Sequence, residues 1–304
     1  VTSLPLSNQP LQLGEAKDIR VVARKITMAE NGQQVEVKAN TNIPVLGITG
    51  TGGAGKSSVT DEIVRRFLHN YPEKTIAVIS VDPSKKKTGG ALLGDRIRMN
   101  AISHPRAYMR SLATRDDNTA LSSHVREAID ICKEAGYDLV ILESAGVGQS
   151  DASILDYCNV SMYVMTPEYG AASQLEKINM LDYADVICIN KFDKAGALDA
   201  LHDVRKQYKR NHGLWTATDE QLPIVGTMAS KFGDEGVNML FRKLITTIEE
   251  KTNIAIGAVT FLPSGEGLGG AAIIPPARVR YLSEISDNNR NYNTWVEEQA
   301  AAAT

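Results

Sequence analysis

Near residue 50 the chain reads Gly50-Thr51-Gly52-Gly53-Ala54-Gly55-Lys56-Ser57, which matches the pattern G-x-x-x-x-G-K-[ST]. The match follows a short apolar run at 45–49 and precedes a segment, 59–68, in which apolar residues recur at helical spacing. A strand that passes through a glycine-rich loop into a helix is the context in which this pattern binds phosphate. The sequence therefore predicts a P-loop NTPase fold built around this segment.

The rest of the central region alternates between apolar runs and helical patterns. Because strands that alternate with helices form parallel sheets, we expect an α/β fold with a mostly parallel sheet flanked by helices. Ligands of such sheets bind beyond the carboxyl ends of the strands. We expect further strands at 75–81, 138–142, 160–166, 186–190 and 224–227, and helices around 118–135, 172–183, 196–210 and 235–250.

The two ends of the chain differ from this central region. Residues 1–42 are polar and rich in turn signals, which favours an N-terminal arm or linker, with a strand or hairpin near 35–37. After residue 252 a glycine-rich stretch and Pro275-Pro276 precede a polar, partly helical segment. We therefore predict an arm at 1–42, a P-loop domain at 43–252, and a C-terminal linker and arm at 253–304.

Bulk composition narrows the class of protein. The net charge is −3 over 304 residues, so nothing in the overall electrostatics indicates nucleic acid or an anionic membrane as a partner. No apolar run reaches the length of about 18 residues that a membrane span requires. The three cysteines lie far apart without a C-x-x-C pair, as expected of reduced thiols in a cytoplasmic protein: Cys132, Cys158 and Cys188.

The glycine-rich loop has residue types suited to phosphate. Glycines allow backbone N–H groups to curl around phosphate oxygens, and the helix that follows directs its positive end at the same anion. Lys56 is placed to reach the β- and γ-phosphates, and the Ser57 hydroxyl to ligate Mg²⁺. The predicted nucleotide-binding residues of this loop are Gly50, Gly52, Gly53, Ala54, Gly55, Lys56, Ser57 and Ser58.

Three carboxylates are candidates for a second Mg²⁺ anchor. Asp82 ends the strand at 75–81, Asp95 lies in a glycine-containing loop, and Glu143 ends the strand at 138–142. Glu143 stands where an ordinary GTPase has the Asp of D-x-x-G, which places the Gly146 N–H to sense the γ-phosphate. Each carboxylate also suits a helix cap or a turn. Gln149 is a candidate for positioning the attacking water.

Asn190-Lys191-Phe192-Asp193 follows the strand at 186–190 and matches N-K-x-D. One carboxylate accepts hydrogen bonds from both N1–H and the 2-amino group of guanine, whereas adenine leaves it unmatched. Asp193 therefore favours GTP or GDP over ATP, with Asn190 and Lys191 completing the motif. After the next predicted strand, a backbone N–H near Ala229 is expected to contact the guanine oxygen.

Four stretches together resemble the MeaB/ArgK group of metallochaperone-type GTPases: residues 45–58, 89–99, 143–149 and 166–181. Within this group they look most like the G domain of the fused isobutyryl-CoA mutases. Residues 165–177 resemble that subgroup's third switch, and residues 278–282 resemble its linker into the mutase substrate domain. Proteins of this group are chaperones for acyl-CoA mutases that depend on adenosylcobalamin.

The resemblance implies roles that spacing alone does not. Ser57, Asp95 and Glu143 would surround Mg²⁺, with Asp82 nearby, although Glu143-Ser144-Ala145-Gly146 departs from the usual Glu-Thr-Ser/Val-Gly. Gln174, Glu176 and Lys177 would form a mobile switch that couples nucleotide state to the mutase. Catalysis of GTP hydrolysis would then rest on Lys56, Asp95, Glu143 and Gly146.

The function implied is gating of adenosylcobalamin loading and removal of damaged cofactor. The partners would be the cobalamin-binding and substrate domains of the mutase, fused or separate, and we expect a homodimer. None of the five histidines lies in a D-x-H-x-x-G motif, so adenosylcobalamin would bind only through those partner domains.

Other functions stay open at this level. A metal-delivery GTPase needs clustered His or Cys, and here both are scattered. A small-molecule kinase has no general need to read guanine. A nucleotide-locked scaffold that never hydrolyses GTP remains a third alternative.

Overall fold

A computed structural model of the chain describes residues 18–38, 42–83, 99–114, 124–145, 152–170, 175–260, 290–296 and 299. Within these residues, seven parallel strands form one sheet in the order β3-β2-β4-β1-β5-β6-β7. This confirms the predicted α/β class. The strands are β1 (Val45–Gly50), β2 (Ile76–Pro83), β3 (Ala107–Thr114), β4 (Leu139–Glu143), β5 (Val160–Met165), β6 (Val186–Asn190) and β7 (Ile224–Thr227).

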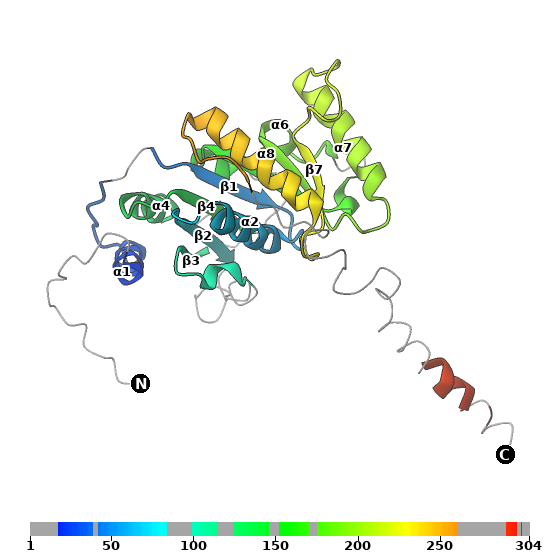
Figure 1. Ribbon diagram of the computed structural model, residues 1–304, viewed down its shortest axis with the longest axis horizontal. Coiled ribbons are helices and arrows are strands. Elements are labelled where there is room, and N and C mark those ends of the chain that lie inside the picture. The colour runs from blue at the N-terminus through cyan, green and yellow to red at the C-terminus, as the bar shows by residue number, and fades with distance from the viewer. Residues whose placement is uncertain are drawn as a thin grey trace. The chain divides into compact units, whose positions relative to one another are not determined.

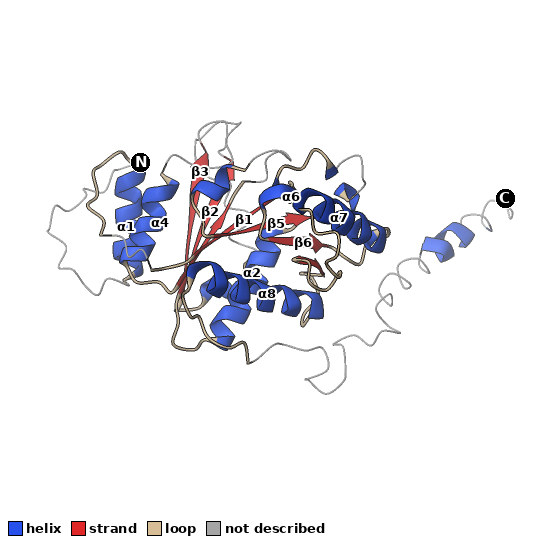
Figure 2. Cartoon of the chain, turned by 90° about the horizontal axis from the view of Figure 1, so that it is seen from above, coloured by secondary structure: helices blue, strands red, loops and turns tan. Residues whose placement is uncertain are grey.

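Helices cover both faces of the sheet, as Figures 1 and 2 show. The α-helices are α1 (Ile19–Glu30), α2 (Lys56–Asn70), α4 (Val125–Glu134), α6 (Met180–Tyr183), α7 (Ala197–His212) and α8 (Glu235–Thr252). Helices α2 and α8 bury their apolar residues in one core cluster, and α1, α4, α6 and α7 bury theirs in another. Short 3₁₀ turns complete the list: Ala101–Ser103, Ser153–Asp156 and Pro167–Tyr169.

Each central strand supplies side chains to both cores, because successive residues point to opposite faces of a sheet. In β2, Ile76 and Val78 join the core beneath α2 and α8, whereas Ala77 and Ile79 join the opposite one. Every residue of β1, β4, β5 and β6 is buried. This explains why these strands appear in the sequence as continuous apolar runs rather than alternating ones.

Strand β1 lies between β4 and β5. The next three strands in the sequence, β2 to β4, lie on one side of β1, and the last three, β5 to β7, lie on the other side. At such a point, where the strand order reverses, the loops after adjacent strands diverge and leave a crevice for ligands. The loop at 50–55 follows β1 at this point. The fold therefore places the glycine-rich loop where an open parallel sheet binds its ligand.

Four segments differ from the sequence-based expectation. Residues 19–30, expected to be irregular, form helix α1, which packs against α4 and buries Val22 and Ile26. Residues 35–37 form no strand. Strand β3 was not expected and pairs along β2 at the edge of the sheet. Of the helix expected around 172–183, the residues after 174 that the structure describes show only the short α6.

Contacts divide the chain into two units, Val1–Leu262 and Pro263–Thr304. In the second unit, residues 290–296 are helical, and the rings of Tyr292 and Trp295 lie 5.9 Å apart. The boundaries predicted at 42/43 and 252/253 remain predictions.

Candidate functional site

The loop after β1 has a backbone that only glycine permits at two positions. Gly50 has φ +153°, and a Cβ there would lie 2.0 Å from the carbonyl oxygen of Val164. Gly55 has φ +88°, and its Cβ would lie 2.5 Å from Nδ2 of Asn190. Gly55 is also the N-cap of α2, with no side chain to cap the helix. The first N–H groups of α2 therefore open into the loop, where an anion is favoured.

Lys56, the first residue of α2, bends back over this loop. Its Nζ donates hydrogen bonds to the carbonyl oxygens of Gly50, at 3.2 Å, and of Thr51, at 3.3 Å. The residue is buried, with 8% of its surface exposed. A buried ammonium held by backbone carbonyls places a positive charge directly above the glycine-rich loop.

The carboxylate of Glu143 accepts hydrogen bonds from two hydroxyls of α2. Ser57 Oγ donates to Glu143 Oε1 at 2.6 Å, and Thr60 Oγ1 donates to Oε2 at 3.0 Å. Glu143 ends β4, pairs in register with Ile48 of β1, and is 3% exposed. Two of the predicted Mg²⁺ ligands, Ser57 and Glu143, are therefore in direct contact beside the glycine-rich loop.

Of the other predicted metal ligands, Asp82 lies among the described residues and Asp95 does not. Asp82 is 5% exposed and lies near the carboxyl end of β2, the strand next to β4. Asp95 and Gly146, and the candidate Gln149, lie outside the described residues. The structure thus brings Ser57 and Glu143 together, with Asp82 on the neighbouring strand.

Asn190, at the end of β6, joins the glycine-rich loop to the loop after β7. Its Nδ2 donates to the carbonyl oxygen of Ala54 at 2.9 Å. Its Oδ1 accepts from Thr227 Oγ1 at 3.2 Å and from the Ala229 N–H at 3.1 Å. Asn190 is 3% exposed. One buried amide therefore fixes the position of three segments that are far apart in the sequence.

Of the residues after Asn190, Lys191 and Phe192 are half-buried and Asp193 reaches the surface. Lys191 has a φ of +58°, which is rare for a side-chain-bearing residue, and its Nζ donates to the Gly53 carbonyl oxygen at 2.7 Å. Asp193 is exposed. Phe192 packs its ring against Gly226, where a Cβ would lie 2.6 Å from a ring carbon. This packing holds the turn against β7 and leaves the Asp193 carboxylate at the surface.

The predicted switch follows β5. Glu176 and Lys177 are exposed, and Glu176 lies 3.9 Å from Arg210 of α7. Gln174 lies outside the described residues. At the start of the segment, Glu168 forms an ion pair with Lys194, next to Asp193. Hydrogen bonds from Lys194 and Thr166 lower the pKa of Glu168 to about 2, so the Glu168 carboxylate carries its negative charge at neutral pH.

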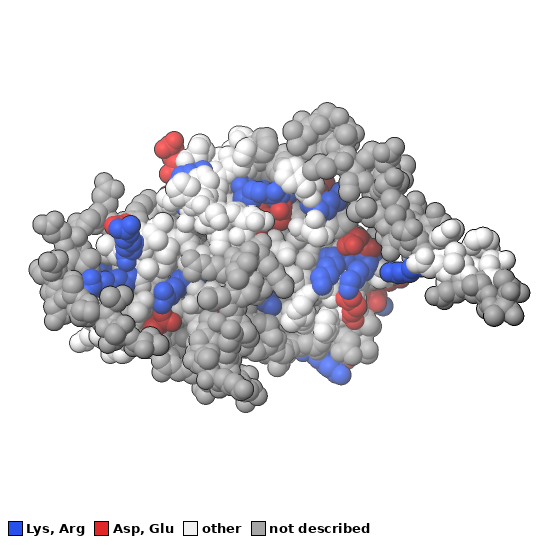
Figure 3. Space-filling view, turned by 90° about the horizontal axis from the view of Figure 1, so that it is seen from below, with Lys and Arg blue, Asp and Glu red and all other residues white. Residues whose placement is uncertain are grey.

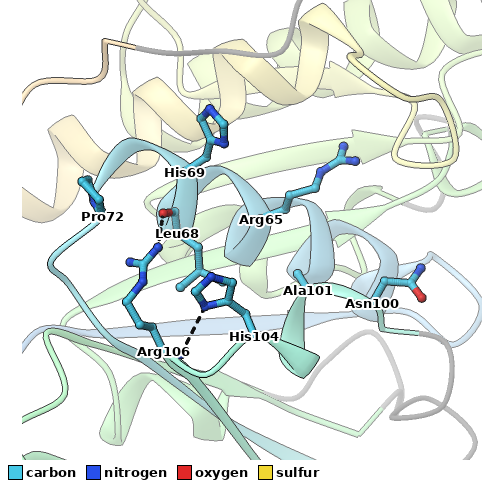
Figure 4. A pocket seen from close by; sticks show the side chains of 8 residues that line it. All are labelled: Arg65, Leu68, His69, Pro72, Asn100, Ala101, His104 and Arg106. Carbon is cyan, nitrogen blue, oxygen red and sulfur yellow. Dashed lines mark hydrogen bonds between the residues drawn. The ribbon is translucent and has the colours of Figure 1, made fainter.

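A pocket lies away from this site, at the carboxyl end of α2 (Figure 4). Its basic side chains have structural partners. Arg106 donates to the carbonyl oxygens of Leu68 at 2.6 Å, Tyr71 at 2.7 Å and Lys74 at 2.8 Å. The guanidinium therefore caps the end of the helix that begins at the glycine-rich loop.

The surface shown in Figure 3 mixes the two signs of charge, with Lys and Arg side chains standing beside Asp and Glu. Among the helices that the structure describes, none is both long enough and apolar enough to cross a membrane.

Two contributors to the site were missed from the sequence. Thr60 lies one helical turn after Ser57 and reaches the same carboxylate, and Thr227 donates to Asn190. The spacing of Ser57 and Thr60 along a helix places both hydroxyls on one face, which is the signal that could have identified Thr60. Thr227 gave no such signal, because its partner lies 37 residues away.

The chain matches known proteins over most of its length. A family model described as methylmalonyl Co-A mutase-associated GTPase MeaB matches residues 22–258. The fused isobutyryl-CoA mutase of Geobacillus kaustophilus is 50% identical over 94% of this chain. The protein of the same name from Cupriavidus metallidurans is 50% identical over 95% of it. The chain spans only 28% and 27% of the lengths of these two relatives.

Solved structures support the fold alone, because their sequences are distant. An LAO/AO transport system kinase has a TM-score of 0.55 at 21% identity, covering 94% of this chain and 82% of its own. HypB from Helicobacter pylori, in complex with nickel, has a TM-score of 0.52 at 15% identity, covering 81% and 99%. Since the family model matches well over half of the sequence, the chain belongs to the MeaB family of methylmalonyl-CoA mutase-associated GTPases.

Proposed function

We propose that this chain binds GTP or GDP with Mg²⁺ and hydrolyses GTP at the loop of residues 50–57. The observation that carries the proposal is the pair of hydrogen bonds from Asn190 to Ala54 and from Lys191 to Gly53. These bonds attach the guanine motif directly to the phosphate loop. A nucleotide that spans the two motifs meets phosphate ligands at one end and a base-reading carboxylate at the other.

The phosphates would be held by the backbone N–H groups that open from the loop into α2. In the structure Lys56 Nζ is bonded to two loop carbonyls, which are weaker partners than a phosphate oxygen. We expect it to turn from them to the β- and γ-phosphates. Catalysis would rest on Lys56 together with Asp95, Glu143 and the Gly146 N–H.

The residues present fit Mg²⁺. This ion prefers hard oxygen ligands and is usually held by one or two carboxylates together with waters and substrate phosphates. The Ser57 hydroxyl and the Glu143 carboxylate are oxygen ligands already in contact beside the loop, and Asp82 and Asp95 would complete the acidic side. When bound, the ion would neutralise charge on the β- and γ-phosphate oxygens.

The base would be read by the exposed carboxylate of Asp193, which suits N1–H and the 2-amino group of guanine. Asn190 would act mainly by holding the loops, because its amide already has three partners. The N–H of Ala229 is one of those partners, so its predicted contact with the guanine oxygen would be shared with Asn190 or gained by a small shift.

We also propose that this chain acts as a chaperone for the domains of a mutase, either fused to it or separate from it. The relatives that match most of this chain are named fused isobutyryl-CoA mutases, and most of their length lies outside the match. The switch at Gln174, Glu176 and Lys177 would couple nucleotide state to adenosylcobalamin loading and to removal of inactive cofactor by the mutase domains. We expect a cytoplasmic homodimer.

The test is to measure GDP and GTP binding by titration calorimetry and phosphate release with Mg²⁺ for the chain and for Lys56→Ala. Lys206→Ala, an exposed lysine on α7, is the matched control. We expect Lys56→Ala to abolish phosphate release and the control to leave it unchanged. Tight GTP binding without phosphate release in the unmodified chain would instead identify a nucleotide-locked scaffold.

A further inference from the structure

Asp234 holds the backbone of the loop that follows β7. It is the N-cap of α8 and is 4% exposed. Its Oδ2 accepts a hydrogen bond from the Val237 N–H at 3.0 Å and another from the Met228 N–H at 3.0 Å. The first bond is that of an ordinary helix cap. The second reaches out of the helix and fixes a neighbouring loop.

The loop at 227–230 is thereby held from two sides. Asn190 binds Thr227 Oγ1 and the Ala229 N–H, and Asp234 binds the N–H of Met228 between them. The fit behind the loop is close, because a Cβ at Gly236 would lie 2.1 Å from the Gly226 carbonyl oxygen. The loop therefore has little freedom to move while both side chains hold it.

The same region is joined to α2, the helix that begins at the phosphate loop. Arg66 of α2 donates through Nε to Asn238 Oδ1 at 2.9 Å and through Nη2 to the Asp234 carbonyl oxygen at 3.5 Å. Arg66 also forms an ion pair with Glu62 on its own helix. A continuous set of polar contacts thus runs from the loop after β7 through the start of α8 to α2.

We propose that Asp234 is a positioning residue for recognition of the guanine base. It does not touch the base; it fixes Met228 and so holds the adjacent Ala229 N–H, which donates to Asn190 Oδ1 at 3.1 Å, where a small shift or a shared bond would bring it to the carbonyl oxygen at position 6 of the ring. The inference rests on the proposed function, since it requires that this loop contacts the base. It adds a residue outside the N-K-x-D motif that sets the preference for a 6-oxo purine over a 6-amino purine.

Three substitutions separate this role from helix capping. Asp234→Ala removes both bonds, whereas Asp234→Ser keeps a good N-cap but has one short-reaching oxygen. Asp234→Asn retains an oxygen of the same reach and serves as the conservative rescue. Asp18→Ala, which removes the N-cap of α1, is the control for losing a cap away from the loop.

The measurement is the affinity of each variant for GDP, IDP and ADP by titration calorimetry, with thermal unfolding to confirm folding. For Asp234→Ala and Asp234→Ser we expect GDP and IDP affinities to fall together by about tenfold, as for loss of a buried hydrogen-bond partner. ADP affinity should not change, so the preference for GDP over ADP falls. Asp234→Asn and Asp18→Ala should behave like the unmodified chain.

Two results would overturn the inference, and they differ. If Asp234→Ser keeps the full preference for GDP over ADP, Asp234 is only a cap, although the proposed function stands. If the unmodified chain shows no preference for GDP over ADP, base recognition itself fails, and the role of Asp234 fails with it.

Discussion

Ser57 Oγ donates a hydrogen bond of 2.6 Å to Glu143 Oε1, although the two residues lie 86 positions apart in the sequence. The contact joins the start of α2 to the end of β4, so a group that binds one residue also meets the other. Both supply oxygen ligands, and the carboxylate is almost fully shielded from solvent. This contact leads to a prediction about Mg²⁺.

Glu143→Gln should remove most of the effect of Mg²⁺ on nucleotide affinity. The amide keeps the shape and can still accept from Ser57, but it lacks the charge that favours a divalent cation. We expect the increase in GTP affinity on adding Mg²⁺ to fall about tenfold, and affinity in EDTA to change little. Titrations with and without Mg²⁺ measure this, with exposed Glu127→Gln as control. An unchanged Mg²⁺ effect would remove Glu143 from the metal site.

Asp193→Asn should change the base preference from guanine to xanthine. The asparagine amide donates where the carboxylate accepted, which matches the 2-oxo group of xanthine. We expect GTP affinity to fall about a hundredfold, because two hydrogen bonds to a charged carboxylate are lost. Affinity for xanthosine triphosphate should rise. Competition binding gives both values. The control is Asp199→Asn, at an exposed carboxylate of α7, which should leave both affinities unchanged. If Asp193→Asn also leaves both affinities unchanged, the assignment of Asp193 to the base is wrong.

The central strands were predictable because their position in the sheet requires a continuous run of apolar residues in the sequence. A strand buried on both faces must be apolar throughout, and β1, β4, β5 and β6 are. Strand β3 is at the edge and carries Arg110 and Ser111 within it, which breaks that pattern. Arg110 is accommodated because it pairs with Glu30 of α1, a contact that no local rule predicts.

The residues of the site also divide into those that could be predicted from the sequence and those that could not. The glycine-rich loop and Asn190-Lys191-Phe192-Asp193 were predictable because phosphate and guanine demand particular residue types at fixed spacing. Thr60 and Asp234 were not, because a threonine in a helix and an aspartate at an N-cap occur in many proteins. Their significance comes from what they touch, Glu143 and Met228, and those contacts depend on the folded sheet.

Gly55→Ala should weaken nucleotide binding more than it weakens the fold. The backbone at Gly55 has a positive φ, which a residue with a Cβ rarely adopts, and a Cβ there would meet Asn190 Nδ2, so the residue that joins the loops must shift. Gly213→Ala at the end of α7 is a matched control, because its φ is +65° but its Cβ meets nothing within 4 Å. We expect about 1 kcal/mol of destabilisation from the backbone alone in the control.

Only Gly55→Ala should also lower GDP affinity, by about tenfold or more, since it displaces a buried hydrogen-bonding group. Chemical denaturation and GDP titration of the two variants give the comparison. Equal GDP affinities would show that Asn190 does not need its present position for binding.

Ile26→Ala should destabilise the main unit strongly, although the segment 1–42 was predicted to be an arm. Ile26 is 0% exposed and lies in the core cluster shared with α4. Loss of a buried isoleucine to alanine should lower the free energy of unfolding by about 2–5 kcal/mol. Arg24→Ala, on the exposed side of the same helix, should change it by less than about 0.5 kcal/mol. Denaturant unfolding measures both, and equal values would show that α1 is an independent arm.

Lys177→Ala should separate nucleotide binding from communication with a mutase. Lys177 is exposed and follows Glu176, which faces Arg210 on α7, so the side chain lies at the surface and not among the nucleotide-binding loops. We expect GDP affinity to stay within about twofold, as for a surface substitution. Any stimulation of GTP hydrolysis by the mutase domains should be lost. Phosphate release by this chain, measured with and without the mutase domains, tests this, with Lys206→Ala as control. Stimulation that survives in Lys177→Ala would place the coupling residue elsewhere in the segment that follows β5.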